Sequence, residues 1–117
     1  MKFSLVLILS LALFSFVNAQ VPEEWTVVIW NPDNTALVGI LNDGLQDALP
    51  EAIAAGQLGA GRWSLAKVNS ITEQAEGNGG DDYLFNIEIT NGQNSTRFSM
   101  LIENDGEENQ LLRWEVL

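Results

Sequence analysis

Carboxylates are the only chemically reactive side chains that this sequence offers in number. It has 16 Asp and Glu residues against 5 Lys and Arg, and it has neither cysteine nor histidine. Thiol and imidazole chemistry are therefore excluded, together with most metal sites. A pair of carboxylates is enough for glycoside hydrolysis. With 16 acidic residues, however, some pair will lie at any chosen separation, so their abundance does not indicate an active site. We expect no enzymatic activity and no cofactor.

The acidic turns also carry oxygen atoms that could bind calcium, at 81–82 and 105–108. The EF-hand loop requires a fixed spacing of acidic ligands around a central glycine, and this spacing is absent. Solvated turns are the simpler interpretation, so we expect no metal site.

The first residues have the pattern of an export signal. Lys2 is followed by the apolar run 5–16, and Val-Asn-Ala at 17–19 is the small-residue pattern of a cleavage site. The run is too short to span a membrane, which needs about 20 apolar residues. We predict a signal peptide at 1–19, a single domain at 20–117, and a secreted, extracellular product without a membrane anchor.

The charge after cleavage is strongly negative, because Lys2 is lost and the 16 acidic residues all remain. Such a surface is repelled by nucleic acid and by anionic membranes, and we expect neither as a partner. A small secreted domain without cysteine cannot use disulfides. It must be stabilised by packing alone, which favours a continuous sheet wrapped on a helix.

The first half of the domain predicts a strand and then a helix. Residues 26–30 are β-branched and aromatic. Asp33 or Asn34 can cap a helix that begins near Thr35, and apolar residues then recur at spacings of three and four. Gly39 and Gly44 weaken this helix, and close approach of helix to sheet explains them. Pro50 ends or bends it, with 51–55 continuing for a turn or two.

The second half predicts three or four strands joined by short turns. Alternation indicates strands at 63–74, 83–89, 97–102 and 111–116, with a bulge near Lys67 and Trp114 as a core residue of the last strand. Turns follow at 77–82, 91–94 and 104–109. The pattern predicts an α+β fold, with one helix packed across a twisted antiparallel sheet of four to five strands.

Two stretches of this second half resemble the cystatins. Residues 64–70 read Ser-Leu-Ala-Lys-Val-Asn-Ser, and they lead through Gln74 to Tyr-Leu-Phe-Asn-Ile-Glu-Ile at 83–89. Cystatins commonly show Leu-Val-Lys-Val-x-Ser, Gln-Val-Val-Ala-Gly and Tyr-Leu-x-Val-Glu-Val in this order. The resemblance implies a cystatin-like fold and a secreted inhibitor that reversibly occludes the active-site cleft of papain-like cysteine proteases. Such an inhibitor needs no catalytic residue of its own.

The resemblance also implies protease contacts, because known cystatins use an N-terminal segment and two hairpins. The residues at these places are Glu24 and Trp25, then Gln74, Ala75, Glu76 and Gly77, and finally Asp105, Gly106 and Glu107. In a register fixed on Gly77, Glu73 takes the place of the glutamine. Charged residues stand at all three places, which favours the alternative of a non-inhibitory secreted binding protein with a cystatin fold.

Two further expectations concern modification and assembly. Asn94, Ser95 and Thr96 form an N-glycosylation sequon at a predicted turn. The glycine-rich turn at 77–80 relaxes the strain that drives strand exchange in cystatin-like domains, so we expect mainly a monomer.

Overall fold

A computed structural model describes residues 25–75 and 80–117. The predicted signal peptide at 1–19 lies outside the described residues, as do Glu24, Glu76 and Gly77. In chain order the elements are β2 (Thr26–Val28), α1 (Thr35–Ala54), β3 (Ser64–Ala75), β4 (Asp81–Thr90), β5 (Ser95–Asn104) and β6 (Asn109–Val116).

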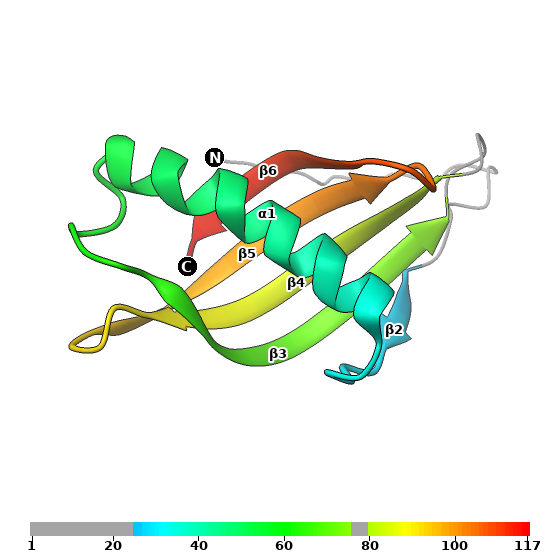
Figure 1. The fold of residues 1–117 in the computed structure, drawn as a ribbon, viewed down its shortest axis with the longest axis horizontal. Helices are drawn as coiled ribbons and strands as arrows, with labels where there is room; N and C mark the ends of the chain where they lie inside the picture. Colours follow the sequence, from blue (N-terminus) through cyan, green and yellow to red (C-terminus); the bar gives the residue numbers. More distant parts are fainter. Residues whose placement is uncertain (1–24, 76–79) are drawn as a thin grey trace, which may run out of the picture.

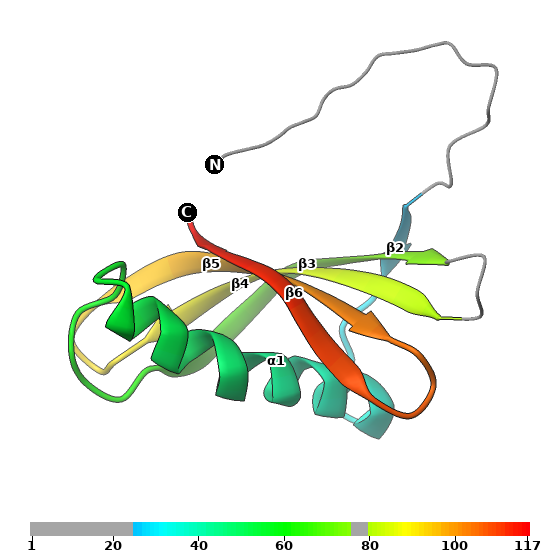
Figure 2. The same cartoon turned by 90° about the horizontal axis from the view of Figure 1, so that it is seen from above.

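The strands form one antiparallel sheet in the order β2-β3-β4-β5-β6, and α1 lies across one face of it (Figures 1 and 2). Over the described part of the chain, this confirms the predicted α+β architecture of one helix on an antiparallel sheet of four to five strands, and the sheet has five. No described helix has the length and apolar character needed to cross a membrane.

The helix begins where the sequence predicts, because Asn34 caps it. The Asn34 side chain accepts a hydrogen bond from the backbone N–H of Leu37 at 3.1 Å. Gly44 is buried where the helix lies against the sheet, and a Cβ there would lie 2.2 Å from Ile102 Cδ1. A Cβ at Gly39 would meet nothing within 4 Å, so close approach explains Gly44 and does not explain Gly39.

The helix continues through Pro50 and ends at Ala54. Gly56 follows with φ 75° and donates to the carbonyl of Ile53, while Gln57 N–H bonds the carbonyl of Ala52. These two bonds form a Schellman cap, which needs the left-handed conformation that glycine adopts without strain. Leu58 then turns back into the core.

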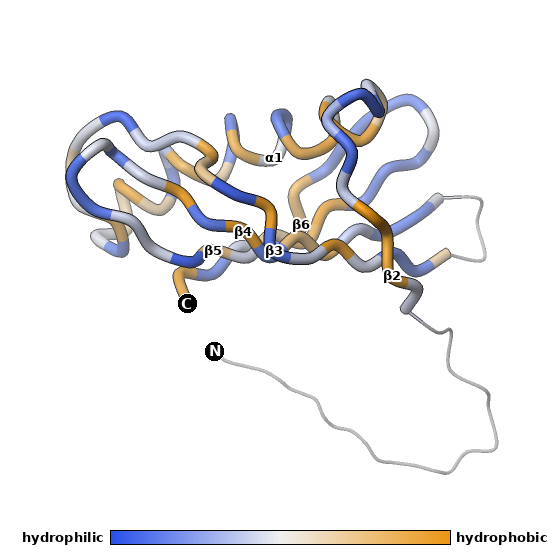
Figure 3. Tube along the Cα trace, turned by 90° about the horizontal axis from the view of Figure 1, so that it is seen from below, coloured by the Kyte–Doolittle hydropathy of each residue, from blue (hydrophilic) through white to orange (hydrophobic). Residues whose placement is uncertain are grey.

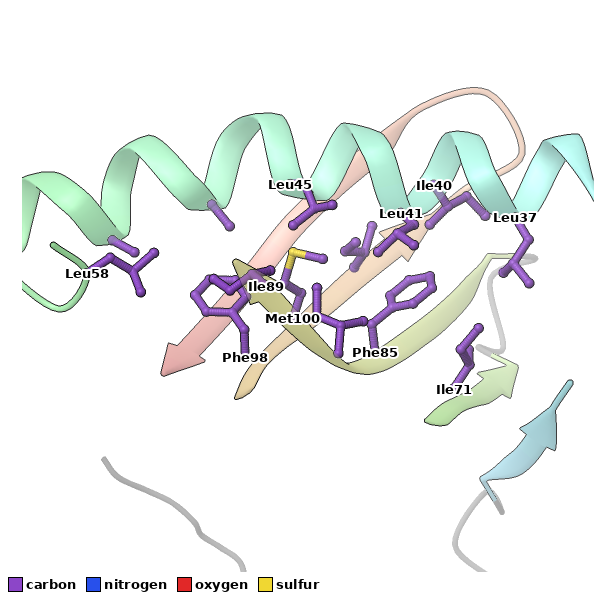
Figure 4. Close-up of a cluster of buried hydrophobic side chains, with 14 residues drawn as sticks. Leu37, Ile40, Leu41, Leu45, Leu58, Ile71, Phe85, Ile89, Phe98 and Met100 are labelled. Atoms are coloured by element: carbon purple, nitrogen blue, oxygen red, sulfur yellow. The ribbon is translucent and has the colours of Figure 1, made fainter. Parts of the chain in front are cut away.

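The core lies between α1 and the sheet. Alternate residues of β4 and β5 point towards the helix and meet the apolar stripe of α1 (Figure 4). The buried hydrophobic residues are Leu37, Ile40, Leu41, Leu45, Ala48, Ala52, Leu58, Ile71, Phe85, Ile87, Ile89, Phe98, Met100 and Ile102.

Trp114, predicted to be a core residue, is partly buried and packs against the margin of this core. Its ring stacks on Phe98 with the centroids 6.0 Å apart, and its Nε1 donates to Glu51 Oε1 of α1 at 2.8 Å. It thereby fixes β6 to the helix.

Two register shifts in β3 mark bulges, between Leu65 and Lys67 and between Val68 and Ser70. The first confirms the irregularity predicted near Lys67. The second lies just beyond the last pair between β2 and β3, which joins Val28 to Ile71. A bulge bends its strand, and β2 is accordingly shorter than the predicted 26–30 strand.

Candidate contact edge

The three segments implied by the cystatin resemblance lie at one end of the sheet. Thr26 pairs with Glu73, Asp81 with Asn104, and Asn104 with Asn109. The start of β2, the end of β3 with the start of β4, and the β5–β6 turn therefore lie along the same end of the sheet, at the right of Figure 1. We name the described candidates here, Trp25, Gln74, Ala75, Asp105, Gly106 and Glu107, the contact edge.

Exposed apolar side chains mark the first segment. Val28 pairs with the buried Ile71 and faces the helix, so its neighbours point away from the core. The exposed fractions are 43% for Trp25, 74% for Val27 and 83% for Ile29. Figure 3 shows this hydrophobic run of β2 at the margin of the sheet. Water is therefore in contact with an apolar surface beside the contact edge.

The β3–β4 segment is only partly described. Ala75 is exposed and Gln74 is half-buried at the end of β3, where Gln74 pairs with Asp82. Because Glu76 and Gly77 lie outside the described residues, the tip of this hairpin stays a prediction.

The β5–β6 turn is held by its own side chains. The Asp105 carboxylate accepts hydrogen bonds from the N–H groups of Glu108 at 2.8 Å and Glu107 at 2.9 Å. These bonds hold the pKa of Asp105 below its ordinary value. Gly106 has φ 99°, a conformation that L side chains rarely adopt. The turn thus has a fixed shape before any partner binds.

Two asparagines attach this turn to the helix. Asn104 Nδ2 donates to Asn109 Oδ1 at 2.6 Å, and Asn109 Nδ2 donates to Asp43 Oδ2 at 2.7 Å. This chain of bonds runs from the end of β5 across the start of β6 to α1. Sequence patterns gave no sign of it, because it joins residues 66 positions apart.

Three ionisable groups, Glu73 on β3 and Asp81 and Tyr83 on β4, lie close together next to the contact edge. Glu73 and Tyr83 are cross-strand partners, and the Tyr83 hydroxyl donates a hydrogen bond to the Glu73 carboxylate. Burial raises the pKa of Glu73, and the nearby Asp81 carboxylate raises it further against the lowering effect of the Tyr83 bond. Burial, followed by the bond to Glu73, raises the pKa of Tyr83 to about 12.

Negative charge is concentrated at this end of the molecule. Residues 73–75, 80–82 and 103–110 contain no lysine or arginine, and they contain the carboxylates of Glu73, Asp81, Asp82, Glu103, Asp105, Glu107 and Glu108. Asp82 is only 9% exposed, and its Oδ1 has no hydrogen-bond partner. Within the described residues, no group of three or more His, Cys, Asp or Glu is placed to hold a metal ion.

In comparisons with known proteins, no family model, no curated protein and no solved structure matches the chain. The cystatin resemblance therefore depends on the sequence phrases at 64–70 and 83–89, and on the arrangement of strands and helix that accompanies them.

Proposed function

We propose that the protein is a secreted, cystatin-like inhibitor of papain-like cysteine proteases that blocks the active-site cleft reversibly. The observation that carries the proposal is the meeting of three separate segments at one end of the sheet. A cleft can be filled by such an edge without any catalytic group. The chain has neither cysteine nor histidine, and an inhibitor of this kind needs neither.

The shape of the edge supports occlusion. The β5–β6 turn is already ordered by Asp105 and Gly106, so little conformational entropy is lost when it enters a cleft. Trp25 adds an exposed aromatic ring, the kind of side chain that most often dominates the free energy of an interface.

The direct test is inhibition of papain and of several cathepsin-type proteases with a peptide substrate. We expect reversible, competitive inhibition, and Trp25→Ala should raise the inhibition constant about tenfold or more. Leu117→Ala is the matched control. Leu117 is 46% exposed, close to the 43% of Trp25, but it lies at the other end of the sheet beside Arg97. Absence of inhibition at micromolar protein would refute the activity and leave the fold untouched.

The carboxylates favour a second candidate, a non-inhibitory secreted protein that binds a cationic partner through the same edge. Burying a carboxylate without a cationic partner costs several kcal/mol, and seven carboxylates surround this edge. Glu107→Gln separates the two candidates, because it removes one charge from the contact edge. It should leave the fold intact, since the Glu107 side chain forms no hydrogen bond or ion pair within the described residues. It should strengthen binding to a neutral cleft and weaken binding to a cationic partner recovered from extracellular fluid.

A further inference from the structure

The end of the sheet opposite the contact edge combines a sequon with a hollow. The β4–β5 turn carries Asn94-Ser95-Thr96. It lies beside the loop between α1 and β3 at the left of Figure 1. The two enclose a hollow of about 370 Å³ with a mainly polar lining. Its lining includes Gln57, Gly59, Ala60, Trp63, Gln93 and Asn94.

The backbone of Asn94 is fixed while its side chain is left available. Its N–H donates to Asn91 Oδ1 at 2.8 Å, and its carbonyl accepts from Thr90 Oγ1 at 2.9 Å and from Asn91 N–H at 3.1 Å. The residue is exposed, and its amide side chain makes no hydrogen bond within the described residues. The Nδ2 atom is thus accessible at the rim of the hollow.

The opposite wall of the hollow suits a sugar ring. Trp63 is half-buried, and its Nε1 donates to the Gly59 carbonyl at 2.8 Å, which fixes the indole against the loop. Amide side chains such as Gln57 and Gln93 can both donate and accept hydrogen bonds. A pyranose presents hydroxyl groups to such amides and a C–H face to an aromatic ring.

We propose that Asn94 is the acceptor of an N-linked glycan whose first N-acetylglucosamine lies in this hollow against Trp63. In the reaction the Asn94 Nδ2 atom bonds to C1 of the sugar, and the bond from C1 to a lipid-linked pyrophosphate breaks. The amide loses one proton, and the lipid pyrophosphate leaves. The inference depends on the export proposed above, which would bring the chain to the glycosylation enzymes.

The position of the glycan has a consequence for the contact edge. Asn94 and the contact edge lie at opposite ends of the sheet, so the glycan would leave the proposed protease contacts open. Inhibition constants of the glycosylated and deglycosylated forms should therefore agree.

The test is secretion from a eukaryotic host with a heterologous leader, so that failure of the native leader does not enter the result. We expect the exported protein to lose mass on treatment with peptide N-glycosidase F. Asn94→Gln and Thr96→Ala should abolish this loss. Thr96→Ser and Ser95→Ala preserve the sequon and should retain it. Exported protein without a glycan would overturn the proposal.

Packing in the hollow is tested separately on protein from a host that adds only high-mannose glycans, which endoglycosidase H cleaves so that the first sugar stays attached. The endoglycosidase product should keep a Tm about 4 °C above that of the fully deglycosylated protein. Peptide N-glycosidase F also converts the asparagine to aspartate, so its product carries an added charge. The Tm difference between the unglycosylated protein with Asn94 intact and unglycosylated Asn94→Asp, both from a bacterial host, measures the effect of that charge and is subtracted. Equal Tm values for the two enzymatic products after this subtraction would refute the contact with the hollow.

Discussion

Replacing Gly44 by alanine measures how closely the helix lies on the sheet. The new Cβ would lie 2.2 Å from Ile102 Cδ1, 3.1 Å from Ile102 Cγ1 and 3.3 Å from Met100 Sδ, and Ile102 and Met100 are fully buried. Overpacking of this kind costs about 1–3 kcal/mol, whereas alanine in a helix gains up to about 1 kcal/mol over glycine. We expect a net loss of about 1 kcal/mol in the free energy of unfolding.

Gly39→Ala is the matched control in the same helix, because its Cβ meets nothing within 4 Å. It should stabilise the protein by about 1 kcal/mol, which separates the two variants by about 2 kcal/mol in urea denaturation. Ile102→Val removes the clashing Cδ1 atom. Alone it should cost about 1 kcal/mol, but in the Gly44→Ala background that cost should vanish. If both glycine variants stabilise equally, the close contact between α1 and β5 is wrong.

Three further predictions concern the capping residue, the turn and the ionisable cluster. Asn34→Ala removes the cap of α1 and should cost about 1 kcal/mol in denaturant unfolding, whereas Asp33→Ala, which removes no helix-capping bond, should cost little. Gly106→Ala places a side chain at φ 99° and should cost about 1 kcal/mol; Gly59→Ala, at a loop position with equally open surroundings and no positive φ, is the control. Tyr83 is the only tyrosine, so its phenolate absorbance should titrate near pH 12 in the folded protein and near pH 10 in denaturant. Because the folded pKa is the higher one, the stability that Tyr83 contributes is complete below about pH 10 and is lost as the pH rises through about 12. Glu73→Gln should move the folded midpoint part of the way towards 10, and an unchanged midpoint would contradict the hydrogen bond between the two residues.

Local signals in the sequence predicted most of the fold. Asn34 was one of two expected caps, and the bulge near Lys67 followed from a break in alternation. Glycine was interpreted too uniformly, because close approach to the sheet was expected for both Gly39 and Gly44. Helical periodicity already separates them: Gly44 falls in the buried apolar stripe and Gly39 falls outside it.

Less of the candidate site than of the fold could be predicted from the sequence. The nine contact candidates came from the cystatin resemblance, and periodicity alone would not have placed Trp25 at the same end of the sheet as Asp105. The pair of Glu73 and Tyr83 depends on the register between β3 and β4, which runs without a shift from Ser70 to Ala75. A one-residue error in that register would put the tyrosine on the opposite face of the sheet.

The shortness of β2 has a consequence for how the protein opens. Within residues 25–75 and 80–117, only Thr26, Val27 and Val28 pair with β3 from this strand, whereas β3 and β4 pair along nearly their whole lengths. The free energy of local opening follows the number of bonds and contacts that must be broken. Backbone amides of β2 will therefore exchange with solvent far sooner than those of β4, and Trp25 is attached to the least protected strand of the sheet. The contact edge thus consists of two hairpin segments on long strands and one aromatic residue on a strand that opens independently.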